Sequence, residues 1–419
     1  MKQIIIEGNK TLTGTIKVSG AKNSAVALIP AAILADDVVT IENVPNISDI
    51  DALNEIFEYL GAKVERHDNI MKIDPRGIVN KEIPESISKK LRASYYFMSA
   101  LLGKFNKVEM YFPGGCSIGA RPIDQTLKGY KAIGATVIEE GNKYTVTTDK
   151  LIGGHVYLDM PSVGATVNTL LASVKAEGET IIENAAKEPE IVNIATFLNN
   201  MGANIIGAGT SEIRIKGVKK LKGAYTEVIP DRIEAGTYVI AGALVGENLK
   251  IENIIPDHIE SLLLKLKEMG LKMNIGSDFL EISKKDNLKP VKIKTLGYPG
   301  FATDLQQPLT TLLTQCQGTS KLEETIYENR FKNVKYLNDM GANIRLIDNH
   351  NIEIVGKTDL IGKEVYATDL RAGACLVLAG LKANGKTIIK DVDYVLRGYE
   401  NIVEKLTNVG ANIIIEEYN

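Results

Sequence analysis

The sequence predicts an α/β protein of two domains, and internal repetition is the observation that predicts it most strongly. A segment in which an apolar residue precedes a glycine and a turn recurs six times, at intervals of 68–73 residues. Its glycines are Gly61, Gly134, Gly202, Gly270, Gly341 and Gly410. Glycine fits the left-handed position that follows a helix, and a short β-like run follows each one. We therefore expect six copies of a βαβαββ-type unit of about 70 residues.

A second set of segments runs in step with these glycines and predicts helices that are buried. The helices are expected to begin 67–72 residues apart, at Lys22, Arg92, Ser162, Arg232, Asp304 and Arg371. Their bodies, such as Leu376–Ala379, are apolar on nearly every side, which is typical of helices inside a domain. Alternating runs such as Thr180–Glu183 lie between the helices and predict strands.

The domain boundary is expected near Pro230, where the chain is interrupted just before the fourth helix. A chain of 419 residues exceeds one ordinary core, and six units divide into three plus three. Residues 2–18 resemble the strand part of a unit and can complete the last copy. The predicted domains are residues 22–229, which carry the candidate loop described below, and residues 1–21 with 230–419, which form a discontinuous second domain.

Composition excludes several classes of function. The 49 basic and 52 acidic residues give a net charge of -3, so no basic footprint for a nucleic acid is present. The longest apolar run, Ala25–Ala35, is too short to span a bilayer, and no signal peptide is evident. No Cys/His spacing suits a metal, and Gly14–Lys22 does not match a phosphate-binding P-loop. We expect a soluble, cytoplasmic protein without metal, cofactor or obligate protein partner.

The loop at Pro113–Gln125 is the candidate for catalysis. It contains three glycines and a cysteine, Cys116, followed closely by Arg121 and Asp124. A fixed cation favours the thiolate, so Cys116 can serve as a proton donor or a nucleophile. The alternative is a surface turn that happens to contain cysteine. The other two cysteines lie in apolar helix-like runs and are expected in the core.

The charged helix starts are the second candidate feature. Lysine or arginine at a helix N-terminus opposes the helix dipole, so function explains Lys22, Arg92, Arg232 and Arg371 better than helix stability does. If these ends face a common surface, their N–H groups form an anion site. The alternative is that they merely end in solvent. Asp304 is either a helix-capping carboxylate or a general base kept ionised by cations.

Taken together, these segments resemble the UDP-N-acetylglucosamine 1-carboxyvinyltransferases of the enolpyruvyl transferase family, over the whole chain. The resemblance rests on Ser19–Ser24, the Cys116 loop with Arg121–Asp124, Ser162–Thr166, Glu183–Glu190, Thr303–Asp304, Glu328–Phe331, Asp369–Ala372 and Arg397–Glu400. The 5-enolpyruvylshikimate-3-phosphate (EPSP) synthases are the alternative, but they usually have serine at the position of Asn23 and lack the cysteine loop. A non-catalytic binding protein would require Cys116, Asp304 and Arg397 to be idle.

The resemblance implies a fold and a reaction. The fold is two inside-out α/β barrels of three units each, with helices inside, sheets outside and the active site in the cleft between the domains. The substrates are phosphoenolpyruvate and UDP-N-acetylglucosamine. The 3′-hydroxyl of the sugar adds to C2 of phosphoenolpyruvate, C3 is protonated, and the tetrahedral ketal loses phosphate. This is the first committed step of peptidoglycan synthesis.

The resemblance also implies a role for each site residue. Cys116 is expected to protonate C3 and to form a phosphoenolpyruvate adduct, which also makes it the target of the epoxide fosfomycin, and Asp304 is expected to take the hydroxyl proton. The expected phosphoenolpyruvate-binding residues are Lys22, Arg121 and Arg397, with Arg92 and Arg371 completing the cationic wall. The expected sugar-nucleotide contacts are Arg121, Pro122, Ile123, Asp124, Gln125, Ser162, Val163, Gly164 and Ile326, and Asn23 and Arg330 complete the candidate set. Met160 stands where some relatives carry a lysine near the diphosphate.

Overall fold

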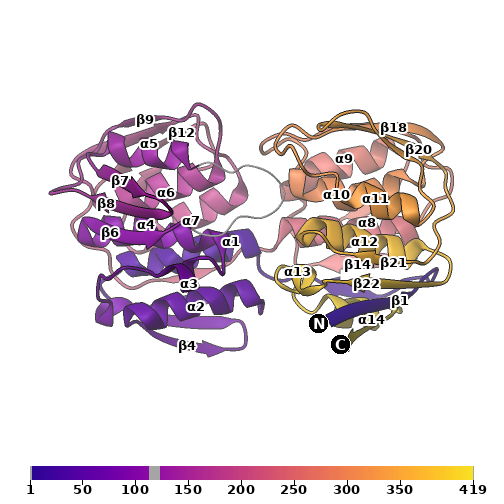
Figure 1. The fold of residues 1–419 in the computed structure, drawn as a ribbon, viewed down its shortest axis with the longest axis horizontal. Coiled ribbons are helices and arrows are strands. Elements are labelled where there is room, and N and C mark those ends of the chain that lie inside the picture. Colours follow the sequence, from indigo (N-terminus) through magenta and orange to yellow (C-terminus); the bar gives the residue numbers. More distant parts are fainter. Residues whose placement is uncertain (1, 113–122, 419) are drawn as a thin grey trace. The chain divides into compact units, whose positions relative to one another are not determined.

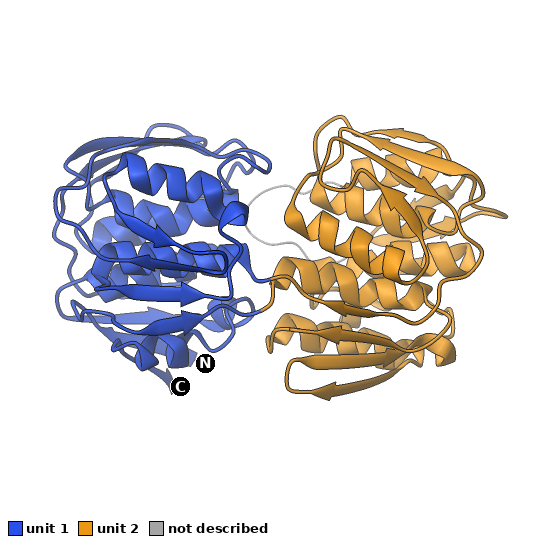
Figure 2. Cartoon of the chain, turned by 180° about the vertical axis from the view of Figure 1, so that it is seen from behind, with its two compact units in different colours: residues 1–19, 117–120, 230–419 blue, residues 20–116, 121–229 orange. Residues whose placement is uncertain are grey.

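The structure is a computed structural model and describes residues 2–112 and 123–418 (Figure 1). Three of the predicted site residues, Cys116, Arg121 and Pro122, lie outside the described residues. The described chain separates into two compact units, which Figure 2 colours differently: residues 20–112 with 123–229, and residues 2–19 with 230–418. Each unit has its own hydrophobic core.

The unit of residues 20–229 combines helices with three open sheets. Its helices are α1 (Lys22–Ala31), α2 (Ser48–Leu60), α3 (Glu85–Ser88), α4 (Tyr95–Phe105), α5 (Asp124–Ala132), α6 (Val163–Ser173) and α7 (Pro189–Asn200). Its strands are β3 (Val39–Glu42), β4 (Lys63–His67), β5 (Ile70–Asp74), β6 (Lys107–Tyr111), β7 (Thr136–Glu140), β8 (Lys143–Thr147), β9 (His155–Tyr157), β10 (Glu179–Glu183), β11 (Asn204–Ile206), β12 (Glu212–Lys216) and β13 (Tyr225–Glu227). The sheet orders are β13-β3-β5-β4, β11-β12-β10-β9 and β6-β8-β7.

The other unit is built in the same way from both ends of the chain. Its helices are α8 (Arg232–Val245), α9 (Glu260–Glu268), α10 (Thr303–Leu313), α11 (Asn333–Asp339), α12 (Leu370–Lys382), α13 (Asp393–Leu396) and α14 (Ile402–Asn408). Its strands are β1 (Lys2–Glu7), β2 (Thr15–Lys17), β14 (Leu249–Glu252), β15 (Met273–Ile275), β16 (Phe279–Ile282), β17 (Lys292–Lys294), β18 (Gly318–Glu323), β19 (Ile344–Leu346), β20 (Asn351–Gly356), β21 (Glu364–Tyr366), β22 (Lys386–Lys390) and β23 (Asn412–Glu417). The sheet orders are β15-β16-β14-β2, β17-β18-β20-β19 and β21-β22-β1-β23.

The four-stranded sheets share one pairing scheme. In each, a short outer strand runs parallel to its neighbour, and the remaining pairs are antiparallel, as in β9–β10, β10–β12 and β11–β12. The expected α/β composition is confirmed, and none of the sheets described closes into a barrel. In the sheet β21-β22-β1-β23, the N-terminal strand β1 is antiparallel to both of its neighbours, so the start of the chain completes a sheet of the C-terminal half.

The prediction of buried helices is confirmed. In α8 every residue from Ile233 to Val245 is buried, and in α12 every residue from Arg371 to Leu381 is buried. The prediction that each of the six spaced glycines follows the end of a helix is confirmed as well. The glycine after each of α2, α5, α7, α9, α11 and α14 has a positive φ of 88–106°. These backbone positions strongly favour glycine.

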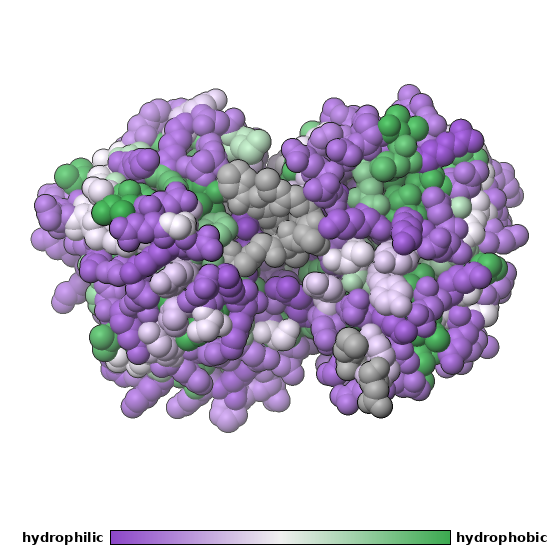
Figure 3. All heavy atoms as spheres, in the orientation of Figure 1, coloured by the Kyte–Doolittle hydropathy of each residue, from purple (hydrophilic) through white to green (hydrophobic). Residues whose placement is uncertain are grey.

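On the face shown in Figure 3, hydrophilic residues cover much of the surface of each unit. Within residues 2–112 and 123–418, the helices are all too short or too polar to cross a bilayer.

Candidate active site

Lys22 begins α1, as the sequence predicts, and its charge is balanced from the neighbouring helix. The Lys22 Nζ lies 2.6 Å from Oδ2 of Asp49, and the Asp49 side chain is only 5% exposed. Asp49 is in the first turn of α2, where a carboxylate is favourable to the helix dipole. Lys22 is therefore a held cation rather than a solvated helix end, and Asn23 follows it in the same turn.

Arg92 does not begin an α-helix, which corrects the expectation for this position. It begins a 3₁₀ turn, Arg92–Ser94, and α4 starts at Tyr95. The turn is held because the Ser94 hydroxyl donates a hydrogen bond of 2.9 Å to the carbonyl of Ser88. The Arg92 guanidinium lies 5.7 Å from the ring centre of Phe112, so it sits where the chain enters the predicted catalytic loop.

The starts of α4 and α6 lie side by side. A methyl group added at Gly164 would be 1.9 Å from the hydroxyl oxygen of Tyr95, so a larger residue there would displace the Tyr95 side chain. Ser162 is the N-cap of α6 and accepts a hydrogen bond of 3.2 Å from the N–H of Ala165. Val163 and Gly164 form the first turn, so the three predicted residues of this segment lie together at one helix end.

The start of α5 is joined to the segment that enters α6. Ile123 precedes α5 and Asp124 is its first residue. The Gln125 amide donates to Oδ2 of Asp124 at 2.9 Å and to Oδ2 of Asp159 at 3.0 Å, and its oxygen accepts from the Asp159 N–H at 2.8 Å. Met160 follows Asp159 and is 63% exposed, so its side chain holds no buried position.

In the other unit, Asp304 lies in the first turn of α10 between two arginines. Its Oδ1 lies 2.6 Å from Nη2 of Arg330, and its Oδ2 lies 3.1 Å from Nη2 of Arg371. The N-cap of α10 is Ala302, and no side chain caps it. Asp304 is therefore not the N-cap residue, and its carboxylate lies in the first turn of the helix.

Both arginines are buried and depend on this carboxylate for charge balance. Arg330 is 2% exposed and Arg371 is 3% exposed. Burial by itself lowers the pKa of the Arg330 guanidinium, but Asp304, Tyr327 and Glu324 together outweigh it and the pKa is raised. Burial acts in the same way on Arg371, and its neighbours Tyr399, Asp304 and Asp231 raise its pKa. The guanidinium of Arg371 lies 5.3 Å from the ring centre of Tyr399.

Arg397 and Ile326 lie on loops of the same unit. Arg397 ends α13 and is half-buried, and the next residue, Gly398, packs against Leu370 at the start of α12. Arg397 is therefore the neighbour in sequence of a glycine that packs against the start of the helix carrying Arg371. Ile326 follows β18 and is 43% exposed, and its N–H donates to a carboxylate oxygen of Glu324 at 2.8 Å.

Side chains cap three of the helix starts, so fewer N–H groups remain there for an anion than the sequence suggests. Ser162 caps α6, and Asp231 and Asp369 cap α8 and α12 by accepting two backbone N–H bonds each. A capped end has fewer N–H groups left for a ligand. The N-cap residues of α1, α4 and α10 make no side-chain cap bond, and Lys22 and Asp304 lie in the first turns of two of these helices.

The residues that hold the predicted site residues are not evident from the sequence. Asp49, Asp159 and Glu324 contact Lys22, Gln125 and Ile326, but each lies 2–34 residues away along the chain. The one feature of the sequence that could have pointed to these residues is a carboxylate at a helix start or at the end of an apolar strand. Such residues are common on surfaces, so only the packing of the elements distinguishes them.

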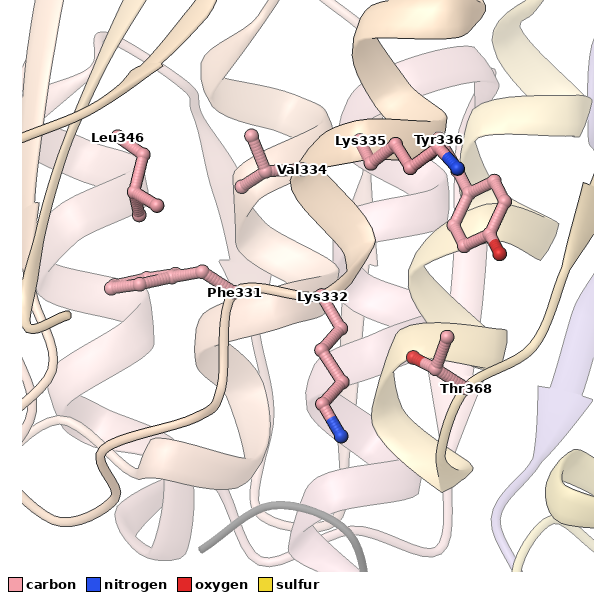
Figure 4. Close-up of a pocket in the computed structure, with 7 residues that line it drawn as sticks. All are labelled: Phe331, Lys332, Val334, Lys335, Tyr336, Leu346 and Thr368. Carbon is pink, nitrogen blue, oxygen red and sulfur yellow. The ribbon is translucent and has the colours of Figure 1, made fainter.

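The arrangement suits anion binding and proton transfer. In the residues described, no three His, Cys, Asp or Glu side chains come together as metal ligands. Figure 4 shows a pocket lined by Phe331, Lys332, Val334, Lys335, Tyr336, Leu346 and Thr368. Its lining contains none of the predicted site residues, so it is not assigned to the substrates.

Comparisons with known proteins place the chain in a family. The family model named EPSP synthase (3-phosphoshikimate 1-carboxyvinyltransferase) matches residues 6–406. UDP-N-acetylglucosamine 1-carboxyvinyltransferase 2 of Streptococcus mutans is 53% identical over 420 residues, covering 100% of both chains. UDP-N-acetylglucosamine 1-carboxyvinyltransferase of Streptococcus pneumoniae is 52% identical over 419 residues, again covering 100% of both chains.

Solved structures agree at the level of the fold. The enolpyruvyl transferase NikO from Streptomyces tendae superposes with a TM-score of 0.90 at 26% identity, covering 100% of this chain and 99% of the other. EPSP synthase from Acinetobacter baumannii superposes with a TM-score of 0.76 at 19% identity over both whole chains, which shows the fold alone. The chain belongs to the enolpyruvyl transferase family of EPSP synthase and, within it, to the UDP-N-acetylglucosamine 1-carboxyvinyltransferases.

Proposed function

We propose that this protein transfers the enolpyruvyl group of phosphoenolpyruvate to the 3′-hydroxyl of UDP-N-acetylglucosamine and releases phosphate. The observation that carries the proposal is Asp304, an acid at an uncapped helix start, held by Arg330 and Arg371. The full-length identity of 52–53% to enzymes named for this acceptor supports the choice of substrate. The reaction is the first committed step of peptidoglycan synthesis, a cytoplasmic process that needs no obligate protein partner.

The chemistry is addition followed by elimination. The sugar oxygen bonds to C2 of phosphoenolpyruvate while Asp304 takes the hydroxyl proton and Cys116 donates a proton to C3. The C3 methyl group of the ketal then loses a proton, and the C2–O bond to phosphate breaks, so the double bond re-forms. Positioned acids and bases of this kind contribute about 10²–10⁴-fold each.

Asp304 has to exchange partners in order to act as a base. A carboxylate held by two guanidiniums is fully ionised but weakly basic. The carboxylate and phosphate groups of phosphoenolpyruvate can each form two parallel hydrogen bonds to arginine, whereas Asp304 meets Arg371 through one oxygen at 3.1 Å. Binding of the substrate therefore draws Arg371 toward the anion and frees one oxygen of Asp304 for the hydroxyl proton.

The remaining site residues are assigned either to phosphoenolpyruvate or to the sugar nucleotide. Lys22, Arg121 and Arg397 bind the phosphate and carboxylate of phosphoenolpyruvate, and Arg92 completes the cationic wall. The proposed sugar-nucleotide contacts are Asn23, Arg121, Pro122, Ile123, Asp124, Gln125, Ser162, Val163, Gly164, Ile326 and Arg330. Because Met160 cannot pair with the diphosphate, backbone N–H groups at Ser162–Gly164 take that role.

We also propose that the fold consists of six related units, three in each domain, with helices inside and sheets outside. The supporting observations are the single pairing scheme of the four-stranded sheets and the positive-φ glycine that follows each of α2, α5, α7, α9, α11 and α14. The proposed domains are residues 22–229 and residues 1–21 with 230–419.

The experiment measures inorganic phosphate released from phosphoenolpyruvate. We expect release that depends on UDP-N-acetylglucosamine and does not occur with shikimate-3-phosphate. The second acceptor is the relevant competitor because the matching family model is named for it. Release with shikimate-3-phosphate alone would assign the chain to the EPSP synthase reaction instead.

A further inference from the structure

Glu324 is a buried carboxylate to which neither the family comparison nor the reaction assigns a role. It directly follows β18 and is 0% exposed. Its Oε1 accepts hydrogen bonds from the Thr295 hydroxyl at 3.0 Å and from the N–H groups of Ile326 and Tyr327 at 2.8 and 3.2 Å. Its Oε2 accepts from the Thr303 hydroxyl at 2.7 Å. Burying a carboxylate is costly unless its oxygens are hydrogen-bonded, and here both oxygens accept hydrogen bonds.

The Thr303 hydroxyl connects Glu324 to the proposed base. Its oxygen also lies 2.7 Å from Nη1 of Arg330, and a guanidinium can only donate hydrogen bonds. Thr303 therefore accepts from Arg330 and gives its single proton to Glu324. Nη2 of Arg330 in turn donates to Asp304 at 2.6 Å. The contacts form one chain from Glu324 through Thr303 and Arg330 to Asp304.

The other oxygen of Glu324 reaches the expected sugar contact. It holds the N–H groups of Ile326 and Tyr327, and the Tyr327 ring centre lies 5.0 Å from the Arg330 guanidinium. The contacts of Oε1 with these two N–H groups are explained by local structure alone, because they stabilise the turn that follows Glu324. Local structure does not explain the contact of Oε2, which runs through the Thr303 hydroxyl to Arg330.

We propose that Glu324 is a positioning residue that fixes the Arg330–Asp304 pair through Thr303 and, with its other oxygen, fixes the loop of Ile326. The proposal rests on the proposed function, because it gives Asp304 the role of base. The negative charge of Glu324 lies on the opposite side of Thr303 from Arg330 and partly neutralises the guanidinium. Glu324 therefore also limits how strongly Arg330 suppresses the basicity of Asp304.

The first test compares three threonine variants in the phosphate-release assay. Thr303→Val removes the link, and we expect kcat to fall about 10–100-fold with little change in the KM for UDP-N-acetylglucosamine, because misplacing a catalytic group has effects of this order. Thr303→Ser restores the hydroxyl, and its kcat should return to within about threefold of the parent. Thr310→Val is the matched control, since its hydroxyl bonds only to a carbonyl of the same helix, Gln306 O at 2.9 Å.

The second test uses Glu324→Gln and the pH dependence of kcat/KM. An amide cannot accept on both sides, and it carries no charge, so Arg330 is less neutralised and stabilises the Asp304 anion more strongly. We expect the acidic limb to move to lower pH, kcat to fall, and the KM for UDP-N-acetylglucosamine to rise through the Ile326 loop. A purely structural role predicts a lower melting temperature with an unmoved acidic limb.

The outcomes separate the two proposals. If the parent enzyme releases no phosphate with UDP-N-acetylglucosamine, the proposed function fails and the positioning role with it. If the parent is active but Thr303→Val matches Thr310→Val, or the acidic limb of Glu324→Gln stays in place, only the positioning role of Glu324 is overturned.

Discussion

At the scale of single residues, charge balance explains the candidate site. Asp304 is the shared counter-ion of Arg330 and Arg371, and Asp49 is the counter-ion of Lys22. Breaking a buried ion pair from one side leaves an uncompensated charge. The same contacts that prepare the site for anions therefore make it sensitive to loss of a carboxylate.

Asp304→Asn tests this balance directly. We expect turnover to fall by about 10²–10⁴-fold because the base is lost. We also expect the free energy of unfolding to fall by about 1–3 kcal/mol, less than for a fully buried pair because Asp304 keeps some solvent contact. Asp51→Asn, which removes an exposed pair with Arg66 at 3.3 Å, is the control and should leave both quantities unchanged. Near-parental turnover in Asp304→Asn contradicts the assignment of the base.

Thiol reactivity tests the proposed role of Cys116. Burial raises the pKa of the Cys316 and Cys375 thiols to about 11, so both stay protonated and unreactive at pH 8. Peptide mass mapping after fosfomycin treatment should show label on Cys116 alone. Cys116→Asp should keep some activity and resist the drug, and Cys116→Ser should be nearly inactive because a hydroxyl is too weak an acid. Label on Cys316 or Cys375 excludes this role for Cys116.

At the scale of elements, the buried helices were predictable and their contacts were not. The apolar bodies and the spaced glycines predict α8, α12 and the glycine after α2 correctly, because period and glycine chemistry are local properties. The 3₁₀ turn at Arg92 was missed because a bond from Ser94 to Ser88 tightens it. The Lys22–Asp49 and Glu324–Thr303 contacts depend on how elements pack, which one sequence does not reveal.

The contact between α10 and α12 gives a pH-dependent prediction. The Cys375 thiol of α12 lies 3.2 Å from the Thr311 hydroxyl of α10, and burial raises its pKa from 9.0 to about 11. Between these values the unfolded thiol has lost its proton and the folded one keeps it. The stability linked to this group is therefore full below pH 9 and is lost as the pH rises to 11.

Cys375→Ala removes this dependence. The parent should lose up to about 2–3 kcal/mol more than the variant between pH 9 and 11, since each pKa unit corresponds to about 1.4 kcal/mol. Denaturant unfolding of both proteins at several pH values measures the difference in their free energies of unfolding. The contributions of the lysines and tyrosines, which both proteins contain, cancel in this difference. A gap that stays constant from pH 8 to pH 11 contradicts the prediction.

At the scale of the whole molecule, the chain ends are part of the fold. Ile4 and Ile6 of β1 are fully buried, and β1 pairs with both β22 and β23. Deleting residues 2–7 removes a central strand, and each lost isoleucine costs about 1.5–3 kcal/mol of burial. We expect limited proteolysis to cut the unit of residues 230–418 and to spare the unit of residues 20–229. Deleting the edge strand β23 is the control and should be milder. Equal resistance to protease in the parent and the β1 deletion contradicts this account.

The central claim is a reaction in which the C2–O bond of phosphoenolpyruvate breaks. The most direct measurement uses phosphoenolpyruvate with ¹⁸O in the oxygen that bridges C2 and phosphorus, together with UDP-N-acetylglucosamine. Addition and elimination predict that the label leaves in inorganic phosphate and that the sugar nucleotide gains an unlabelled enolpyruvyl ether. Phosphate without the label, or a phosphorylated sugar nucleotide, shows cleavage of the P–O bond and contradicts the account.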